Sequence, residues 1–233
     1  RGAIGRLEAF LAEHGLHDNT ILLFLSDNGT QNSNAMAIHN AGMRAKKGSV
    51  VEGGHRVPLF IRWVDGKLRH GMDIHELTTV QDLLPTLIKI CNLEHRWKDS
   101  FDGIDLTPLL RRGNNEGLSE RIVVIQYNNS RPGAAHALLW NKWRYVHGKG
   151  LFNVKEDPGQ QQDLSGEFPE ILERMLTYYK GWRAGVQPVI DQVPYFPVGH
   201  PDADTVFLTC NDWVHIKGDG NVTQQYEVRQ GKS

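Results

Sequence analysis

Asp27, Asn28 and Gly29 directly follow an apolar run at residues 20–26 (TILLFLS), which predicts one strand. Asn-Gly is a strong hairpin signal, but no partner strand follows at hairpin distance. In open α/β sheets, ligands bind beyond the carboxyl ends of the strands. The carboxylate of Asp27 and the amide carbonyl of Asn28 are hard oxygen ligands that suit Ca²⁺ or Mg²⁺. Two interpretations therefore stay open, a metal site and a plain turn.

Two adjacent lysines, Lys46 and Lys47, form the second candidate group. They lie in the segment RAKKGSVVEGGHRVP at residues 44–58. An ammonium group on a flexible stem suits the oxygens of a sulfate or phosphate group. The alternative is a solvated basic loop that binds no ligand. The phosphate-binding pattern G-x-x-x-x-G-K-[ST] is absent from the sequence.

The elements that must position these residues follow an α/β order. Apolar spacing predicts a helix at 3–15 and another at 79–92, with Asp82 as the N-cap of the second and Pro85 in its first turn. Unbroken apolar runs at 20–26 and 57–63 suit strands that are covered on both faces, as in a parallel sheet. The segment 29–56 lacks periodicity and predicts a long functional loop.

The pattern changes after about residue 118. Short apolar segments between turn residues predict an antiparallel meander with strands at 121–127, 135–141, 143–147 and 151–154. A helical pattern follows at 167–182, and spaced prolines from residue 186 predict an extended segment. We therefore expect an α/β protein in three parts, with 1–117 in the main α/β domain, 118–185 in a small α+β subdomain and 186–233 in an extended tail.

The composition narrows the classes of partner. The chain has 26 Lys and Arg against 27 Asp and Glu, a formal net charge of −1, so it lacks the basic excess of nucleic-acid binders. No apolar run approaches the ~20 residues of a membrane span. We therefore expect neither a nucleic-acid partner nor a membrane span. Cys91 and Cys210 lack metal-site spacing; one disulfide is open to them, and two buried free thiols are the preferred interpretation.

Taken in order, the motifs resemble one family. IGRLEAFLAEHGLHDNTILLFLSDNGT followed by KKGSVVEGGHRVPLFIRW resembles the C-terminal half of a type-I, formylglycine-dependent, arylsulfatase-like sulfatase of the alkaline phosphatase superfamily. TTVQDLLPTLIKIC, FDGIDLTPLL and WRYVHGKGLFNVKEDPGQQQDLS continue the resemblance. It implies part of an alkaline-phosphatase-like mixed sheet flanked by helices, followed by a smaller C-terminal antiparallel sheet plus helix.

The resemblance also implies roles for particular residues. Asp27 and Asn28 match the Asp-Asn pair that supplies two calcium ligands in the family, with Mg²⁺ as the alternative ion. Lys47 matches the lysine that contacts the substrate sulfate, so it is both a substrate-binding and a catalytic candidate. Ala45 stands where a glycine is common in the family. A structural frame around the lysine is matched by Ser49, Glu52, Gly53 and Gly54.

The family nucleophile is a formylglycine made from Cys or Ser in a C/S-x-P/A-x-R motif. Neither Cys91 nor Cys210 lies in such a motif, so the resemblance implies a nucleophile in an N-terminal half outside this chain, and we expect the chain alone to be inactive. The expected substrate is a small-molecule or glycan sulfate ester, and the expected location is the periplasm or the cell exterior. Two alternatives stay open: a phosphate or phosphonate ester hydrolase of the same superfamily, and a non-catalytic carbohydrate-binding relative.

Overall fold

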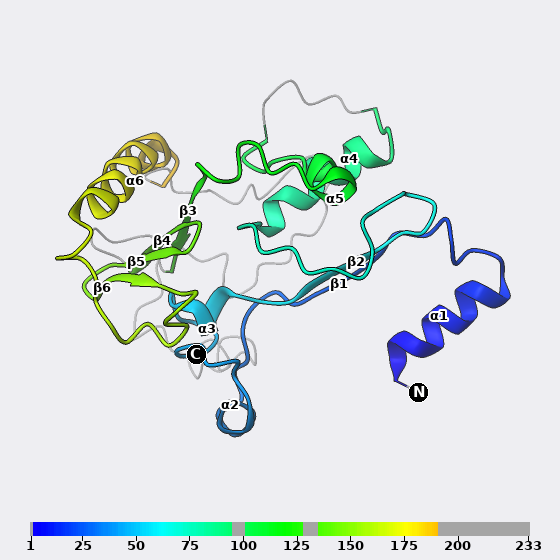
Figure 1. Ribbon diagram of the computed structural model, residues 1–233, viewed down its shortest axis with the longest axis horizontal. Helices are drawn as coiled ribbons and strands as arrows, with labels where there is room; N and C mark the ends of the chain where they lie inside the picture. Colours follow the sequence, from blue (N-terminus) through cyan, green and yellow to red (C-terminus); the bar gives the residue numbers. More distant parts are fainter. Residues whose placement is uncertain (1, 95–100, 128–134, 191–233) are drawn as a thin grey trace, which may run out of the picture. The chain divides into compact units, whose positions relative to one another are not determined.

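The computed structural model describes residues 2–94, 101–127 and 135–190 (Figure 1). Internal contacts divide the chain into two compact units, Arg1–Val186 and Gln187–Ser233. Of the second unit only residues 187–190 are described, and they continue the last helix. The secondary structure is mixed, with helices and two small antiparallel sheets. None of the described helices is long and apolar enough to cross a bilayer.

Helix α1 (Ala3–Glu13) confirms the helix that was predicted near the start of the chain. After it, Gly15 adopts a left-handed conformation with φ 68°, which glycine accepts without strain, and Leu16 N donates to Leu11 O at 2.8 Å. Of the apolar side chains of α1, only that of Leu11 is buried. Three others are 44–51% exposed, namely Ile4, Leu7 and Phe10. Most of the apolar face of α1 is therefore not covered by the described chain.

Strands β1 (Leu22–Leu25) and β2 (Leu59–Arg62) form a two-stranded sheet in which Leu22 lies opposite Arg62. The strands run antiparallel, so the parallel pairing suggested by their apolar runs is wrong. Burial on both faces is also wrong for the described chain, because Phe24 and Phe60 are 47% and 65% exposed. An unbroken apolar run indicates that a strand needs cover on both faces, and the described residues do not supply it.

The long segment between β1 and β2 is not wholly irregular, as the sequence suggested, but contains two short helices. Helix α2 (Ser33–Ile38) begins after Asn32, whose side chain accepts hydrogen bonds from Asn34 N and Ala35 N. Helix α3 (Glu52–His55) is followed closely by β2. Each has fewer than two full turns, which is too short for apolar periodicity to reveal it.

The helix predicted at 79–92 is a 3₁₀ turn, η1 (Val80–Asp82), followed by α4 (Leu83–Ile90). Asp82 is the N-cap residue of α4, as predicted, but its side chain makes no capping hydrogen bond to that helix. Its carboxylate instead completes the capping box of η1, where it accepts from the backbone N of Thr79, the N-cap of η1, at 2.7 Å. Asp82 is fully buried and also pairs with Arg121 at 2.7 Å. Helix α5 (Thr107–Arg112) packs against α4.

The predicted antiparallel meander is confirmed. It consists of β3 (Ile122–Gln126), β4 (His136–Trp140), β5 (Trp143–Val146) and β6 (Gly150–Asn153), paired in that order. Helix α6 (Pro169–Ile190) follows and is longer than predicted. The extended segment expected from residue 186 is therefore wrong over 186–190, because the helix continues through Pro188. The remainder of that tail, 191–233, lies outside the described residues.

The two faces of this sheet pack against different elements, because alternate residues of a strand point to opposite sides. On one face, Met175 of α6 joins a buried cluster that includes Ile122, Leu138 and Leu151. On the other face, Val50 and Val51 join a cluster that includes Val123, Leu139 and Phe152. Since Val50 and Val51 lie between Lys47 and α3, the small sheet directly supports the lysine segment.

The two cysteines have different outcomes. Cys91 caps the C-terminal end of α4 as an exposed free thiol, so the expectation that it is buried is wrong. The last turn of a helix has one side open to solvent. Apolar neighbours in the sequence do not indicate whether a single residue there lies on the buried or the exposed side. Cys210 lies outside the described residues.

Candidate metal and substrate site at the end of strand β1

The residues after β1 form a bend that is held against α3. Ser26 Oγ donates to Asn28 O at 2.9 Å, and Gly29 N donates to Gly54 O at 3.1 Å. A Cβ added at Gly29 would lie 1.9 Å from Gly53 O, so only glycine permits this close approach. The bend is not a two-residue hairpin. It fixes Asp27 and Asn28 just beyond the carboxyl end of β1.

The structure brings the three predicted site residues together. Asn28 Nδ2 donates to Asp27 Oδ2 at 2.8 Å, and Lys47 Nζ lies 3.3 Å from the same oxygen. Lys47 N also donates to Thr30 O at 3.0 Å, which joins the lysine segment to the bend. Lys46 points elsewhere, because its Nζ donates to Ser33 Oγ at 3.1 Å. The two adjacent lysines therefore have different partners.

Asp27 is ionised at neutral pH. The hydrogen bond from Asn28, followed by the hydrogen bond and the charge of Lys47, holds the pKa of the Asp27 carboxyl below its usual value of 3.8. The side chains of Asp27 and Lys47 are 76% and 44% exposed, so solvent screens their attraction. The same exposure leaves the carboxylate and the ammonium accessible to a ligand.

Asp27 and Asn28 fit a hard cation in the chemistry of their donor atoms, but two side chains cannot hold one alone. Calcium takes about six to eight oxygen ligands, and the described residues contain no cluster of three or more His, Cys, Asp or Glu. Asn28 turns its amide nitrogen toward Asp27; a half-turn of that amide would present its oxygen instead. A calcium site here would need further oxygen ligands besides these two side chains.

Backbone contacts shape the segment that carries Lys47. Gly53 N donates to Arg44 O at 2.9 Å, and Ser49 N donates to Lys46 O at 3.2 Å. A Cβ added at Gly54 would lie 2.0 Å from Ser49 O, so a larger residue would push the segment off α3. Gly53 and Gly54 therefore allow close packing of the backbone in this segment.

Ala45 offers a test of this backbone conformation. Its φ is 62°, a left-handed conformation that costs a non-glycine residue about 1–2 kcal/mol. Asn40 Nδ2 donates to Ala45 O at 3.2 Å and holds it there. Ala45→Gly should therefore raise the free energy of unfolding by about 0.5–1 kcal/mol, after the larger entropy of an unfolded glycine is allowed for.

Urea unfolding of the two proteins measures this difference. The matched control is Ala9→Gly on the exposed side of α1, where the same substitution should lower stability by about 1 kcal/mol because the backbone is helical. Opposite signs at the two positions are expected. A loss of stability at Ala45→Gly would contradict the strain argument.

Glu52 connects the lysine segment to the small sheet. It is only 1% exposed and contacts two arginines, Arg144 Nε at 2.6 Å and Arg56 Nη1 at 3.1 Å. Gln160 Oε1 accepts from Glu52 N at 2.9 Å, and Gln160 O accepts from Arg44 Nη1 at 2.9 Å. Sequence reasoning did not find Arg144 or Gln160. The one feature of the sequence that could have indicated this contact is the charged Arg144 within the otherwise uncharged strand β5.

The charge of Glu52 is balanced by the arginines. Burial acts to raise the pKa of its carboxyl, but the charge of Arg144 and its hydrogen bond outweigh burial, so this pKa lies below the usual 4.5. Burial lowers the pKa of His55, whose Nε2 lies 3.9 Å from Glu52 Oε1, and the imidazole is therefore neutral at neutral pH. Glu52 is thus a buried, ionised structural residue.

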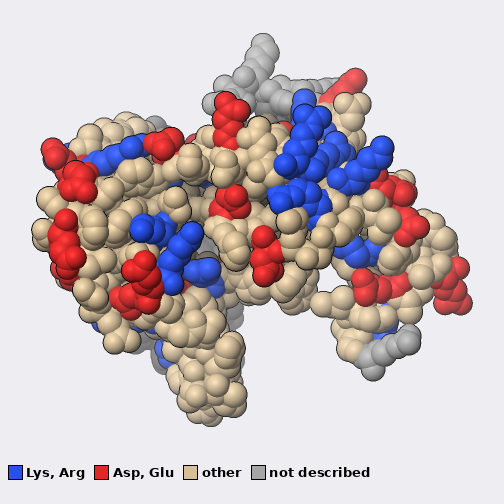
Figure 2. All heavy atoms as spheres, in the orientation of Figure 1, with Lys and Arg blue, Asp and Glu red and all other residues tan. Residues whose placement is uncertain are grey.

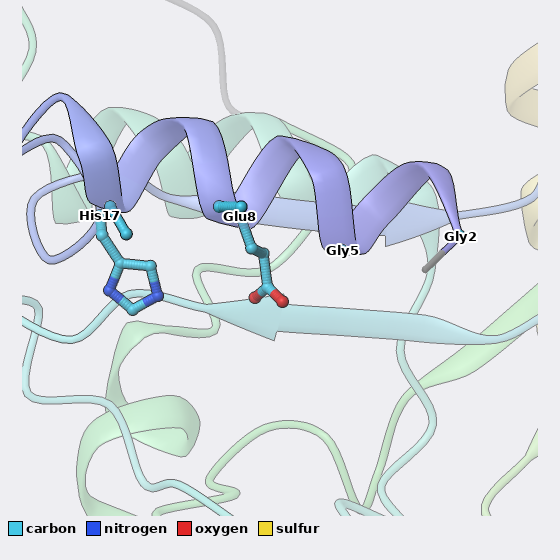
Figure 3. A pocket seen from close by; sticks show the side chains of 6 residues that line it. Gly2, Gly5, Glu8 and His17 are labelled. Carbon is cyan, nitrogen blue, oxygen red and sulfur yellow. The ribbon is translucent and has the colours of Figure 1, made fainter.

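A hollow of about 500 Å³ lies along α1 and contains none of the predicted site residues (Figure 3). Its lining comes from one side of α1 and from the loop after it, namely Gly2, Gly5, Glu8, Ala9, Ala12 and His17. Its two ionisable side chains are already paired, Glu8 with Arg62 at 3.3 Å and His17 with Asp18 at 2.8 Å. The candidate site therefore remains the group around Asp27.

Known proteins resemble this chain in sequence. A family model described as Sulfatase matches residues 2–93, which include Asp27, Asn28 and Lys47. The chain is 35% identical over 210 residues to arylsulfatase A of Bos taurus, across 76% of this chain and 40% of that protein. It is 27% identical over 188 residues to arylsulfatase K of Xenopus laevis, across 75% of this chain and 33% of that protein.

The fold agrees with these matches. A crystal structure of Ps i-CgsB superposes with a TM-score of 0.67 at 25% identity, over 77% of this chain and 40% of that one. The chain thus spans 33–40% of the length of these three relatives. Sequence and structure together show that the chain belongs to the sulfatase family.

Proposed function

We propose that this chain is part of a sulfatase that hydrolyses aryl or carbohydrate sulfate esters with calcium and a formylglycine nucleophile. The observation that carries the proposal is the group of Asp27, Asn28 and Lys47 at the end of β1. The C/S-x-P/A-x-R motif does not occur in the sequence, so we assign the nucleophile to a part of the protein outside these residues. "Complete enzyme" below means the polypeptide that contains this chain and that nucleophile-bearing part.

We assign residues 1–117 to the catalytic domain and 118–185 to the small C-terminal subdomain. In this arrangement β1 and β2 belong to an alkaline-phosphatase-like mixed sheet that is flanked by helices. The exposure of Phe24 and Phe60 supports a further layer over these strands. The enzyme would act in the periplasm or outside the cell.

The names of two relatives support a carbohydrate substrate. The crystal structure of Ps i-CgsB, 25% identical to this chain, has also been determined in complex with k-i-k-neocarrahexaose. N-acetylgalactosamine-6-sulfatase of Sus scrofa is 31% identical over 206 residues. Both names indicate carbohydrates, so a sulfated glycan is the preferred substrate and a small aryl sulfate serves as the practical assay.

The site residues divide the chemistry between them. Asp27 would supply an anionic oxygen to calcium and Asn28 a neutral one, and an ion held there would supply Lewis-acid chemistry toward the sulfate oxygens. Lys47, held 3.3 Å from Asp27, places its ammonium within reach of the same sulfate. There it would donate a hydrogen bond and neutralise the charge that builds on the bridging oxygen in the transition state.

Asp27→Ala tests the metal role. Because the substitution removes an anionic ligand, the calcium concentration for half-maximal hydrolysis of an aryl sulfate by the complete enzyme should rise about tenfold or more. Asp27→Asn keeps an oxygen and loses the charge, so its effect should be smaller. Asp18→Ala removes a carboxylate of similar exposure, 66% against 76%, and should leave the calcium dependence unchanged.

Two outcomes would count against the proposal. An unchanged calcium dependence in Asp27→Ala would remove the metal assignment. Faster hydrolysis of an aryl phosphate than of the matching aryl sulfate by the unmodified complete enzyme would favour the phosphate ester hydrolase of the same superfamily.

A further inference from the structure

Four cations from two segments gather beside α5. Lys67 and Arg69 follow β2, and Arg111 and Arg112 end α5. Hydrogen bonds join the segments, from Arg111 Nε to Gly66 O at 3.0 Å and from Arg69 N to Leu110 O at 2.9 Å. Figure 2 shows Lys and Arg side chains gathered over the region of α4 and α5. We call Lys67, Arg69, Arg111 and Arg112 the basic patch.

The side chain of Arg69 reaches the end of α5. A Cβ built on Gly113, the residue after the helix, would lie 2.5 Å from Arg69 Nη1. The guanidinium of Arg69 therefore lies against the turn that follows Arg111 and Arg112. The three arginines thus meet at the end of α5, and Lys67 follows Gly66, whose carbonyl accepts from Arg111.

The basic patch has no carboxylate partner within ion-pair distance among the described residues. All four side chains are exposed. The C-terminal end of a helix carries about half a negative charge, which accounts for one of the cations at most. A chain of net charge −1 thus gathers four cations that form no ion pair with the described carboxylates.

We propose that the basic patch binds a sulfated polysaccharide, through residues other than those of the Asp27 site. The planar guanidinium donates two parallel hydrogen bonds to an oxyanion, and several cations suit a polymer that repeats its sulfate groups better than they suit one sulfate ester. Such binding would raise the local concentration of substrate. The inference rests on the proposed function, because a glycan sulfatase encounters polymers of this kind.

The test uses Lys67 and Arg112, two patch residues whose side chains make no hydrogen bond or ion pair with described residues, so that the fold is not disturbed. The patch variant is Lys67→Glu plus Arg112→Glu in the complete enzyme. The control variant, Lys149→Glu plus Lys155→Glu, makes the same change of net charge at two exposed lysines on either side of β6. The probe is heparin, a sulfated polysaccharide.

The dissociation constant for heparin at low salt should rise roughly 30-fold or more in the patch variant, because losing two cations near a polyanion alone accounts for about that factor and the new carboxylates add repulsion. It should stay within about threefold in the control variant. Equal losses in both would mean that overall charge decides binding, and no loss in the patch variant would mean that the patch does not bind; either result overturns the proposal. Duplex DNA bound as tightly as heparin would overturn the assignment to sulfated polysaccharides.

Hydrolysis of a small aryl sulfate separates this inference from the proposed function. Its kcat and KM should be the same in the patch variant and the unmodified complete enzyme, because Arg62, which precedes the patch, pairs with Leu22 at the end of the β1–β2 ladder opposite to Asp27. A changed KM would overturn the separation of the two surfaces. If the unmodified complete enzyme hydrolyses no aryl sulfate, the proposed function fails, and the heparin comparison still decides the role of the patch.

Discussion

Alanine at position 47 should lower the kcat of the complete enzyme for an aryl sulfate by roughly 10² or more. Lys47 Nζ lies 3.3 Å from Asp27 Oδ2, so its ammonium stands beside the oxygens that we propose as calcium ligands. A cation that meets the bridging oxygen interacts more strongly as charge builds there in the transition state. Its loss therefore lowers kcat more than it raises KM, and steady-state kinetics measures both.

Lys46 is the matched control for this experiment. It has the same charge on the same segment, but its Nζ donates to Ser33 Oγ. Lys46→Ala should change kcat less than about threefold, since exposed charges contribute little. Equal losses in the two variants would mean that the charge of the segment alone matters. A larger loss of kcat in Lys46→Ala would mean that Lys46, and not Lys47, is the lysine that contacts the sulfate.

The parts of the fold that were predictable from the sequence are those that depend on neighbours in the chain. Strands β3 to β6 follow one another through short connections, so turn residues and alternating apolar residues revealed both the strands and their antiparallel pairing. The direction of β1 relative to β2 was not predictable. The two strands are separated by a long segment of chain. An apolar run indicates that a strand needs cover, but it does not indicate whether the strand runs parallel or antiparallel to its partner.

In the candidate site, too, the predictable features are those that depend on neighbours in the chain. Asp27 and Asn28 were found because they follow a strand directly. The contact of Asp27 with Lys47 depends on the backbone bond from Lys47 N to Thr30 O, which no local pattern encodes. The choice of Lys47 over Lys46 came from the family resemblance, since both lysines have the same type and surroundings in sequence. Glu52 and Arg144 lie 92 residues apart, so only the folded chain reveals their contact.

The pair of Glu52 and Arg144 carries the second large effect. Their side chains are 1% and 8% exposed, so water cannot solvate one if the other is removed. Removing one partner of a buried ion pair typically costs about 3–5 kcal/mol, because an uncompensated charge stays inside. Arg144→Ala should therefore lower the free energy of unfolding by about 3–5 kcal/mol. Urea unfolding of the complete enzyme measures this loss.

Arg56 provides the control on the same carboxylate. Its Nη1 lies 3.1 Å from Glu52 Oε2, but its side chain is 57% exposed, so Arg56→Ala should cost about 1 kcal/mol or less. Equal losses in Arg56→Ala and Arg144→Ala would contradict the argument, since burial would then not set the strength of the two contacts.

The dependence on pH gives a second check on Glu52. Its folded-state pKa lies below 4.5, so the ionised carboxylate stabilises the fold above the unfolded-state pKa, and this contribution is lost as the pH falls through the lowered folded-state value. The stability difference between the wild type and Glu52→Gln should therefore be largest near neutral pH and shrink in acid. A stability difference that stays constant from neutral to acidic pH would contradict this. Glu52→Gln would then destabilise the fold through packing or hydrogen bonds that do not depend on charge. The attraction between Glu52 and Arg144 would not be what holds the lysine segment on the small sheet.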